Sequence, residues 1–161
     1  MSAKILAQKI RCADILSELS DEHLTQIALN AQLRRFETGD LIAEKGTGST
    51  HAIIILNGTF ACTEGVGEGK KFCEDHIGTV IGEMAMFIDD FEHPSTFVAT
   101  SEINAIQLKR SVMLKLMEND QDLAAQFVEK VTGRLSEIVS AVSEIEKSLA
   151  DYGKERMKAA A

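Results

Sequence analysis

Residues 51–64 read His-Ala-Ile-Ile-Ile-Leu-Asn-Gly-Thr-Phe-Ala-Cys-Thr-Glu, and this stretch decides the fold class. Its apolar run, residues 52–56, has the length of a β-strand. Asn57-Gly58 then gives a strong signal for a tight turn between two strands. The stretch therefore predicts strands at 51–56 and 59–64 that pair as a hairpin.

On both sides of this stretch, short apolar runs are separated by glycines from residue 33 to residue 108. Turn residues at such regular spacing are typical of an antiparallel sandwich or barrel. The other predicted strands are 33–37, 40–43, 71–76, 95–101 and 104–109.

The two ends of the chain change to helical spacing. Apolar residues recur every three to five positions between residues 3 and 33, which predicts helices at about 3–18 and 21–30. Ser20 is expected to cap the second helix. After Ser111 we expect a short helix to about Met117 and a long helix from 121 to about 157.

The long helix would run about 50 Å, which is further than a domain of this size can cover. We therefore divide the chain into residues 1–120, with the first helices and the strands, and residues 121–161, with the long helix. The distal half of the long helix carries a line of apolar residues, here called the seam, at alternating spacings of three and four. This pattern predicts a homodimer through the helix; a solvated tail is the alternative. The seam consists of Leu135, Ile138, Val142, Ile145, Leu149 and Tyr152.

Composition and charge argue against several classes of function. The 161 residues include 17 basic and 25 acidic side chains, and the net charge of −8 disfavours binding to nucleic acids. No apolar run reaches the roughly 18 residues of a membrane span, and the first residues lack a secretory signal, so we expect a cytoplasmic protein. The four histidines and three cysteines show no spacing typical of a metal site, and no motif indicates catalysis. We expect neither an enzyme nor a bound metal.

One motif points to a ligand. Residues 81–87 read Ile-Gly-Glu-Met-Ala-Met-Phe and follow a turn-marked strand. A glycine that frees backbone N–H groups and is followed by a one-turn helix makes a small nest for an anion. Glu83, directly after Gly82, has an acceptor for a sugar hydroxyl.

At this motif the sequence resembles the cyclic nucleotide-binding domain family, over about residues 14–140. The resemblance rests on residues 36–42, on Gly46 followed by residues 53–58, and on residues 78–87 and 96–99. It implies an α+β fold: an antiparallel, jelly-roll-like β-roll flanked by N-terminal helices and a long C-terminal dimerisation helix. It also implies a cyclic nucleotide of the cAMP or cGMP type as ligand, bound in a phosphate-binding cassette.

The resemblance assigns ligand roles within this cassette. Gly82 would present its backbone N–H to the cyclic phosphate, and Glu83 would hold the ribose 2′-hydroxyl. Met84 and Ser95 are further candidate ligand contacts. On the long helix, where relatives place polar residues against the base, only Ser140 has a hydroxyl to offer, since Ile138 and Val139 are apolar.

The chain departs from the family pattern at two adjacent positions of the cassette. His93 stands where the resemblance implies an arginine for the phosphate, and Pro94 follows where a backbone N–H is expected. Proline has no such donor. A protonated His93 would partly replace the arginine, but an ordinary histidine pKa near 6.5 leaves it mostly neutral at pH 7.

Two hypotheses follow. The first is a stand-alone dimeric regulatory module that senses a cyclic nucleotide or a related anion at Gly82, Glu83, His93 and Ser95 and acts on a partner protein through direct contacts. The second is a ligand-free scaffold for protein interaction. Because no winged helix follows the long helix in this sequence, we expect no binding to DNA. The lack of an apolar run of spanning length predicts no membrane partner either.

Overall fold

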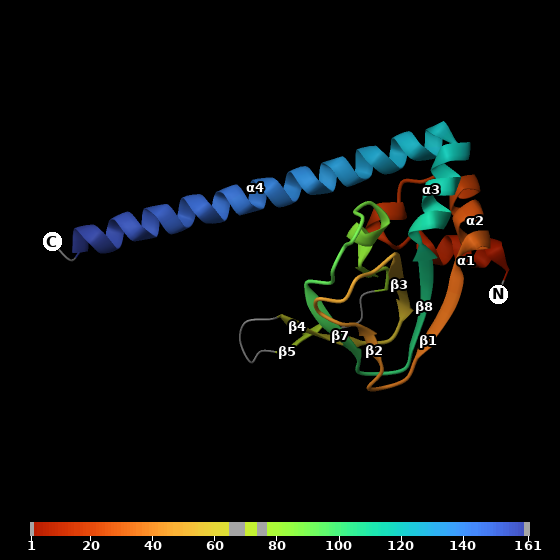
Figure 1. Cartoon of the computed structure of the whole chain (residues 1–161), viewed down its shortest axis with the longest axis horizontal. Helices are drawn as coiled ribbons and strands as arrows, with labels where there is room; N and C mark the ends of the chain where they lie inside the picture. Colours follow the sequence, from red (N-terminus) through yellow and green to blue (C-terminus); the bar gives the residue numbers. More distant parts are fainter. Residues whose placement is uncertain (1, 65–69, 74–76, 160–161) are drawn as a thin grey trace.

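The computed structural model describes residues 2–64, 70–73 and 77–159 and shows two antiparallel sheets with helices on one side (Figure 1). The helices are α1 (Ala3–Ile10), the 3-10 turn η1 (Asp14–Leu16), α2 (Asp21–Asn30), the 3-10 turn η2 (Glu83–Met86), α3 (Arg110–Asn119) and α4 (Gln121–Ala159). The strands are β1 (Gln32–Phe36), β2 (Leu41–Ala43), β3 (His51–Asn57), β4 (Phe60–Glu64), β5 (Lys70–Cys73), β6 (Val80–Ile81), β7 (Ser95–Ala99) and β8 (Ile103–Lys109). The predicted α+β roll with N-terminal helices and a long C-terminal helix is confirmed.

The strands form two four-stranded sheets, ordered β1-β8-β3-β6 and β2-β7-β4-β5. Successive side chains of β3 point to opposite faces of the first sheet. Ala52, Ile54 and Leu56 pack in the core under the helices. Ile53 and Ile55 pack in a second core between the two sheets. Strand β3 is therefore buried on both faces, and the space between the sheets is the interior of the roll.

The predicted hairpin between strands 51–56 and 59–64 is wrong. The chain does turn at Asn57-Gly58, where Gly58 has φ +92°. However, β3 pairs with β8 and β6, whereas β4 pairs with β5 and β7 in the other sheet. The turn carries the chain from one sheet to the other, because the apolar residues of β3 need cover on both faces.

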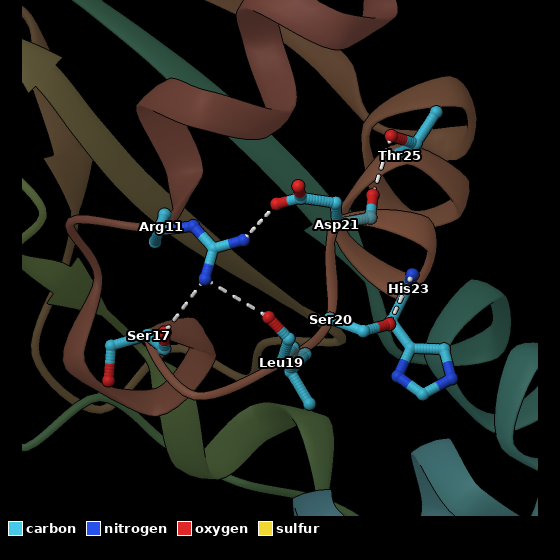
Figure 2. A network of polar contacts seen from close by, with 7 residues as sticks. All are labelled: Arg11, Ser17, Leu19, Ser20, Asp21, His23 and Thr25. Carbon is cyan, nitrogen blue, oxygen red and sulfur yellow. Dashed lines mark hydrogen bonds and ion pairs between the residues drawn. The ribbon is translucent and has the colours of Figure 1, made fainter.

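The predicted first helix, 3–18, is broken into α1 and η1. Arg11 follows the end of α1, and its guanidinium donates to the carbonyl oxygens of Ser17 (3.3 Å) and Leu19 (3.2 Å). It also pairs with the carboxylate of Asp21 (Figure 2). These bonds hold the chain in a bend between α1 and α2. Ser20 caps α2 as predicted and accepts from the backbone N–H of His23 at 3.2 Å.

Two further differences lie near the middle of the chain. The two-residue strand β6 was not predicted, because Val80 and Ile81 are too short a run to indicate a strand. Of the predicted strand 71–76, residues 71–73 lie in β5. Residues 74–76 lie outside the described part of the chain.

The long helix α4 begins at Gln121, and the carboxylate of Asp120 accepts from the N–H groups of Asp122 (3.1 Å) and Leu123 (3.0 Å). His23 Nε2 lies 3.1 Å from the other Asp120 oxygen, which ties the start of α4 to α2. The bond from Leu123 is the main reason that the pKa of Asp120 is lowered.

Only the first part of α4 packs on the domain. Leu123 and Phe127 are fully buried, and the helix then extends away from the roll (Figure 1). Leu135, Val142, Ile145, Leu149 and Tyr152 of the predicted seam are 42–65% exposed, whereas the side chain of Ile138 lies outside the described part. Among the described residues, no helix combines the length and apolar character that a membrane crossing requires.

The stability of the fold is expected to depend strongly on one glycine. Gly78 has φ +91°, and a Cβ at this position would lie 2.3 Å from the Cys12 carbonyl oxygen. Gly78→Ala should therefore cost about 1–2 kcal/mol of backbone strain and about 1–3 kcal/mol more for the steric conflict. Urea unfolding followed by circular dichroism measures this loss.

The matched control is Gly39→Ala, because Gly39 also has positive φ (+94°) but open space around its Cβ position. Gly39→Ala should lose only the free energy of unfolding that the backbone strain costs. Equal losses for the two variants would contradict a tight packing of Gly78 against the bend after α1.

Candidate functional site

Gly82 forms the turn between β6 and η2. It adopts φ +75°, the left-handed region that favours glycine, and its carbonyl oxygen accepts from the Ala85 N–H at 3.0 Å. The one-turn helix expected after Gly82 is present as η2. Glu83 and Met84 lie on this turn and are half-buried.

His93 lies directly against Gly82. A Cβ on Gly82 would be 2.7 Å from His93 Cε1 and 3.3 Å from the carbonyl oxygen of His51. The imidazole therefore occupies the space that the missing side chain leaves. It is 93% buried, since its exposed fraction is 7%.

The backbone of His93 is fixed as firmly as its ring. The His93 N–H donates to the Thr47 carbonyl at 3.0 Å, and its carbonyl accepts from the Gly46 N–H at 2.8 Å. The ring of Phe91 meets the imidazole edge-on, with centroids 5.6 Å apart. Pro94 follows and is exposed. The backbone bonds to Thr47 and Gly46 and the contact with Phe91 thus hold the ring over Gly82.

Burial lowers the pKa of His93 below the ordinary value of 6.5. The pKa of His51 is also lowered, first by burial and then by the positive charges of His93, Arg34 and Lys109. Both rings are consequently neutral at pH 7, and protonation of His93 begins at a lower pH than the sequence alone suggested. A neutral imidazole gives no charge with which to hold a phosphate.

The remaining candidates are spread over several elements. Ser95 begins β7, opposite Glu64 of β4, and is half-buried. Ser140 is exposed on α4, in the exposed half of that helix. No hydrogen bond among the described residues joins Ser140 to Gly82 or His93. The structure therefore brings Gly82 and His93 into contact, places Glu83 and Met84 beside them, and leaves Ser140 apart.

The cassette is linked to α4 by packing. Met86, the last residue of η2, is buried in the core under the helices. The ring of Phe87, the next residue, packs against Phe127 of α4 with centroids 5.1 Å apart. The end of η2 and the base of α4 are therefore in direct side-chain contact.

Comparison with known proteins identifies the family of this fold. The sequence model of the cyclic nucleotide-binding domain matches residues 33–120, which is more than half of the chain and includes Gly82 and His93. The chain belongs to the cyclic nucleotide-binding domain family. No curated protein sequence matches it well enough to count as a relative.

Solved structures with the same fold are distant in sequence. The N-terminal domain of a transcriptional regulator from Streptomyces coelicolor has a TM-score of 0.71 and 16% identity, over 86% of this chain and 94% of its own. The sensor domain of the regulator DNR from Pseudomonas aeruginosa has a TM-score of 0.66 and 17% identity, over 86% of this chain and 93% of its own. The catabolite activator protein of Thermus thermophilus has a TM-score of 0.67 and 18% identity, over 83% of this chain and 63% of its own. At such identities the likeness concerns the fold alone.

This cyclic nucleotide-binding domain has a further group of basic residues that the sequence analysis did not find. His51 and Lys109 are directly opposite each other in the pairing of β3 with β8. Both belong to the set of side chains that alternate toward the roll interior, as does Arg34 on β1 opposite Ala105. The alternation of buried residues along these strands is the signal that would have shown them.

One cavity lies away from the cassette. It has a volume of about 690 Å³ and runs between η1 and α4, where Lys130 pairs with Glu18 at 2.7 Å and Asp14 at 3.7 Å. Within the described ranges, no group of three or more His, Cys, Asp or Glu side chains is arranged to hold a metal ion.

The lowered histidine pKa values predict that acid weakens the fold. In the unfolded chain both histidines take up a proton near pH 6.5, whereas in the fold His51 and His93 resist it, so the unfolded state binds more protons. The free energy of unfolding should therefore decrease as the pH is lowered from about 7 to about 5.

Urea titrations at several pH values measure this slope. His93→Gln keeps a polar side chain of similar size without a titrating group, so its slope should be smaller than that of the unmodified protein. A profile that is flat in both proteins would show that neither histidine resists protonation.

Proposed function

We propose that the protein is a dimeric regulatory domain that acts through protein contacts and whose cassette does not bind cyclic nucleotides in the described conformation. One observation carries the proposal: the neutral, buried imidazole of His93 fills the space beside Gly82. This is the position at which the family resemblance places the cyclic phosphate. The proposal assigns the chain no catalytic role.

The chemistry of the cassette supports this proposal. A charge-assisted hydrogen bond to the phosphate contributes roughly 1.5–3 kcal/mol and a neutral one roughly 0.5–1.5 kcal/mol. His93 and Pro94 remove one of each, which weakens binding by about 30-fold to 1000-fold. Asp90 and Glu92 are exposed close to His93 in sequence and add negative charge that repels an anion.

The long helix supports a dimer. Five seam residues of α4 are exposed along one side of a helix whose distal part has no cover from its own domain. Large apolar side chains at heptad spacing are stabilised when a second helix removes them from water. A parallel pair of α4 helices from two copies provides that cover.

A second candidate function is a weak sensor of cyclic nucleotides, and it has its own observation. Gly82 keeps its left-handed conformation, and Glu83 follows it on η2, as a ribose contact requires. For this function the His93 ring has to leave Gly82 when the ligand enters. That movement breaks the packing against Phe91 and therefore costs binding energy.

Calorimetric titration with cAMP and cGMP distinguishes the two functions. The unmodified protein should show no saturable binding at micromolar ligand. His93→Arg with Pro94→Ser restores a cationic side chain and a backbone donor, so it should gain about 2–4 kcal/mol of binding free energy.

The single variant Pro94→Ser is the control, since it restores the donor and leaves the His93 ring in place. Tight binding by the unmodified protein would contradict the proposal and favour the sensor. A folded double variant without any gain would show that Gly82 and Glu83 are not placed for a nucleotide.

Dimerisation is tested by sedimentation. Val142→Glu with Ile145→Glu places two charges in the seam and should give a monomer. Ser136→Glu with Ser140→Glu adds the same charge on the other side of α4 and should remain a dimer. A seam variant that still sediments as a dimer would remove α4 from the interface.

A further inference from the structure

Strand β1 forms an open edge of the first sheet. In the order β1-β8-β3-β6 its neighbour is β8, and no strand in the described part of the chain pairs with its other side. Four of its five residues, Gln32, Leu33, Arg34 and Arg35, are exposed. Figure 1 shows β1 at the outer edge of the roll, on the side away from which α4 extends. Along such an edge, backbone N–H and C=O groups face outward without a sheet partner, so β1 can pair with one more strand.

A groove lies beside this edge and is lined by residues of α1, β1 and β3. It has a volume of about 320 Å³. Leu33 and Leu56 give the groove an apolar surface, and Leu33 is 57% exposed although its side chain is large and apolar. Lys9 of α1 and both Arg34 and Arg35 of β1 also line it. The groove therefore combines an apolar surface with three positive charges.

Two of these three cations have no ionic partner among the described residues. Arg34 and Lys9 form no ion pair there, whereas Arg35 pairs with Glu102 at 2.6 Å. The guanidinium carbon of Arg34 lies 5.8 Å from the centre of the Phe36 ring, so this charge lies along the strand. In a chain of net charge −8, this edge is a local positive region, and it attracts an acidic partner.

The positive charges lie on both faces of β1. Arg34 shares the face toward the roll interior with Phe36, whereas Leu33 and Arg35 share the face under the helices. The side chains of an added strand alternate in the same way, so two successive residues of that strand meet Arg34 and Arg35 in turn. Glu37 follows β1 and is exposed, so it repels a carboxylate placed beyond the end of the strand. The matching segment therefore carries its acidic residues in its middle.

We propose that β1 and its groove bind an acidic, extended segment of a partner protein, which adds to the first sheet as a strand. One carboxylate of the segment faces Arg34, the next faces Arg35 and Lys9, and an apolar side chain beside them packs on Leu33. The backbone hydrogen bonds supply affinity, and the side chains select the partner. This inference rests on the proposed function, because it names the surface through which a domain that acts by protein contacts reaches its partner.

The same charges disfavour a second copy of β1 as the occupant. Pairing of two β1 strands would bring the arginines of both copies close together, and like charges on paired strands are destabilising. Charged side chains commonly protect open edges from such pairing. Protection alone, however, does not require an exposed Leu33 beside a groove. An acidic strand with an apolar side chain is the occupant that fits both features.

The test uses the full chain and the hexapeptide Thr-Val-Glu-Glu-Val-Thr with blocked ends. This sequence reads the same from both ends, so it offers the same pattern to β1 in either strand direction. In nuclear magnetic resonance titrations at low salt, the amide signals of residues 32–36 should shift and saturate with a Kd of about 1 mM or tighter. The bound peptide should also slow hydrogen exchange at the outward-facing N–H groups of β1.

Two control peptides separate charge from strand pairing. Thr-Val-Lys-Lys-Val-Thr has the opposite charge and should not bind, because the cations of β1 repel it. The acidic peptide with methyl groups on both glutamate nitrogens keeps its charge but loses the N–H group that would donate to β1. It should lose the slowed hydrogen exchange and most of the affinity.

Arg34→Glu reverses one unpaired charge of the edge and should weaken binding of the acidic peptide by about tenfold or more. Lys115→Glu is the matched control, because Lys115 is exposed on α3, does not line the groove and undergoes the same change of charge. It should leave the affinity within about twofold. Since Arg34 is exposed, both variants should keep the circular dichroism spectrum of the unmodified protein.

The outcomes separate this inference from the proposed function. If the acidic peptide does not bind, while the chain is a dimer that does not bind cAMP, the inference is overturned and the proposed function stands. If the peptide binds as expected and cAMP binds too, the inference holds and the closed cassette fails. Peptide binding that is unchanged by Arg34→Glu or by methylation of the glutamate nitrogens would not use the edge of β1 and would overturn the inference.

Discussion

The structure depends on the burial of β3 on both of its faces. Five consecutive residues, 52–56, are buried, and they alternate between the core under the helices and the core inside the roll. A shift of one residue in the pairing of β3 with β8 would exchange the two sets of side chains. The same register that fills both cores also sets His51 directly opposite Lys109.

Gly82 and His93 constrain each other in the site. Gly82 is needed for its positive φ, and its missing Cβ also makes the room in which the His93 ring lies. The ring is in turn fixed by the backbone bonds of His93 to Thr47 and Gly46. A guanidinium at residue 93 is longer than an imidazole and carries its charge further from the backbone, so the substitution changes both the charge and the shape of the cassette.

Local patterns predicted the elements better than their partners. The sequence predicted the Ser20 cap of α2, the turn at Gly82 and the start of α4. Each of these features depends on residues that are neighbours in the chain. The hairpin at Asn57-Gly58 failed because a turn signal says that the chain reverses, but not which strand lies beside it. The break after α1 depends on Arg11, whose carbonyl partners lie six and eight residues away. The lowered pKa of His93 depends on burial, which no local pattern records.

Two contacts determine how the cassette and α4 influence each other. Phe87 packs on Phe127, so a displacement of η2 pushes against the buried base of the long helix. The bond of His23 to Asp120 resists this push, because it holds the N-terminus of α4 to α2. Closely packed side chains do not yield gradually but change between discrete arrangements. The His23 contact and the Phe87 contact therefore hold the base of α4 against α2 and η2, while the part of α4 that carries the apolar seam has no such contact.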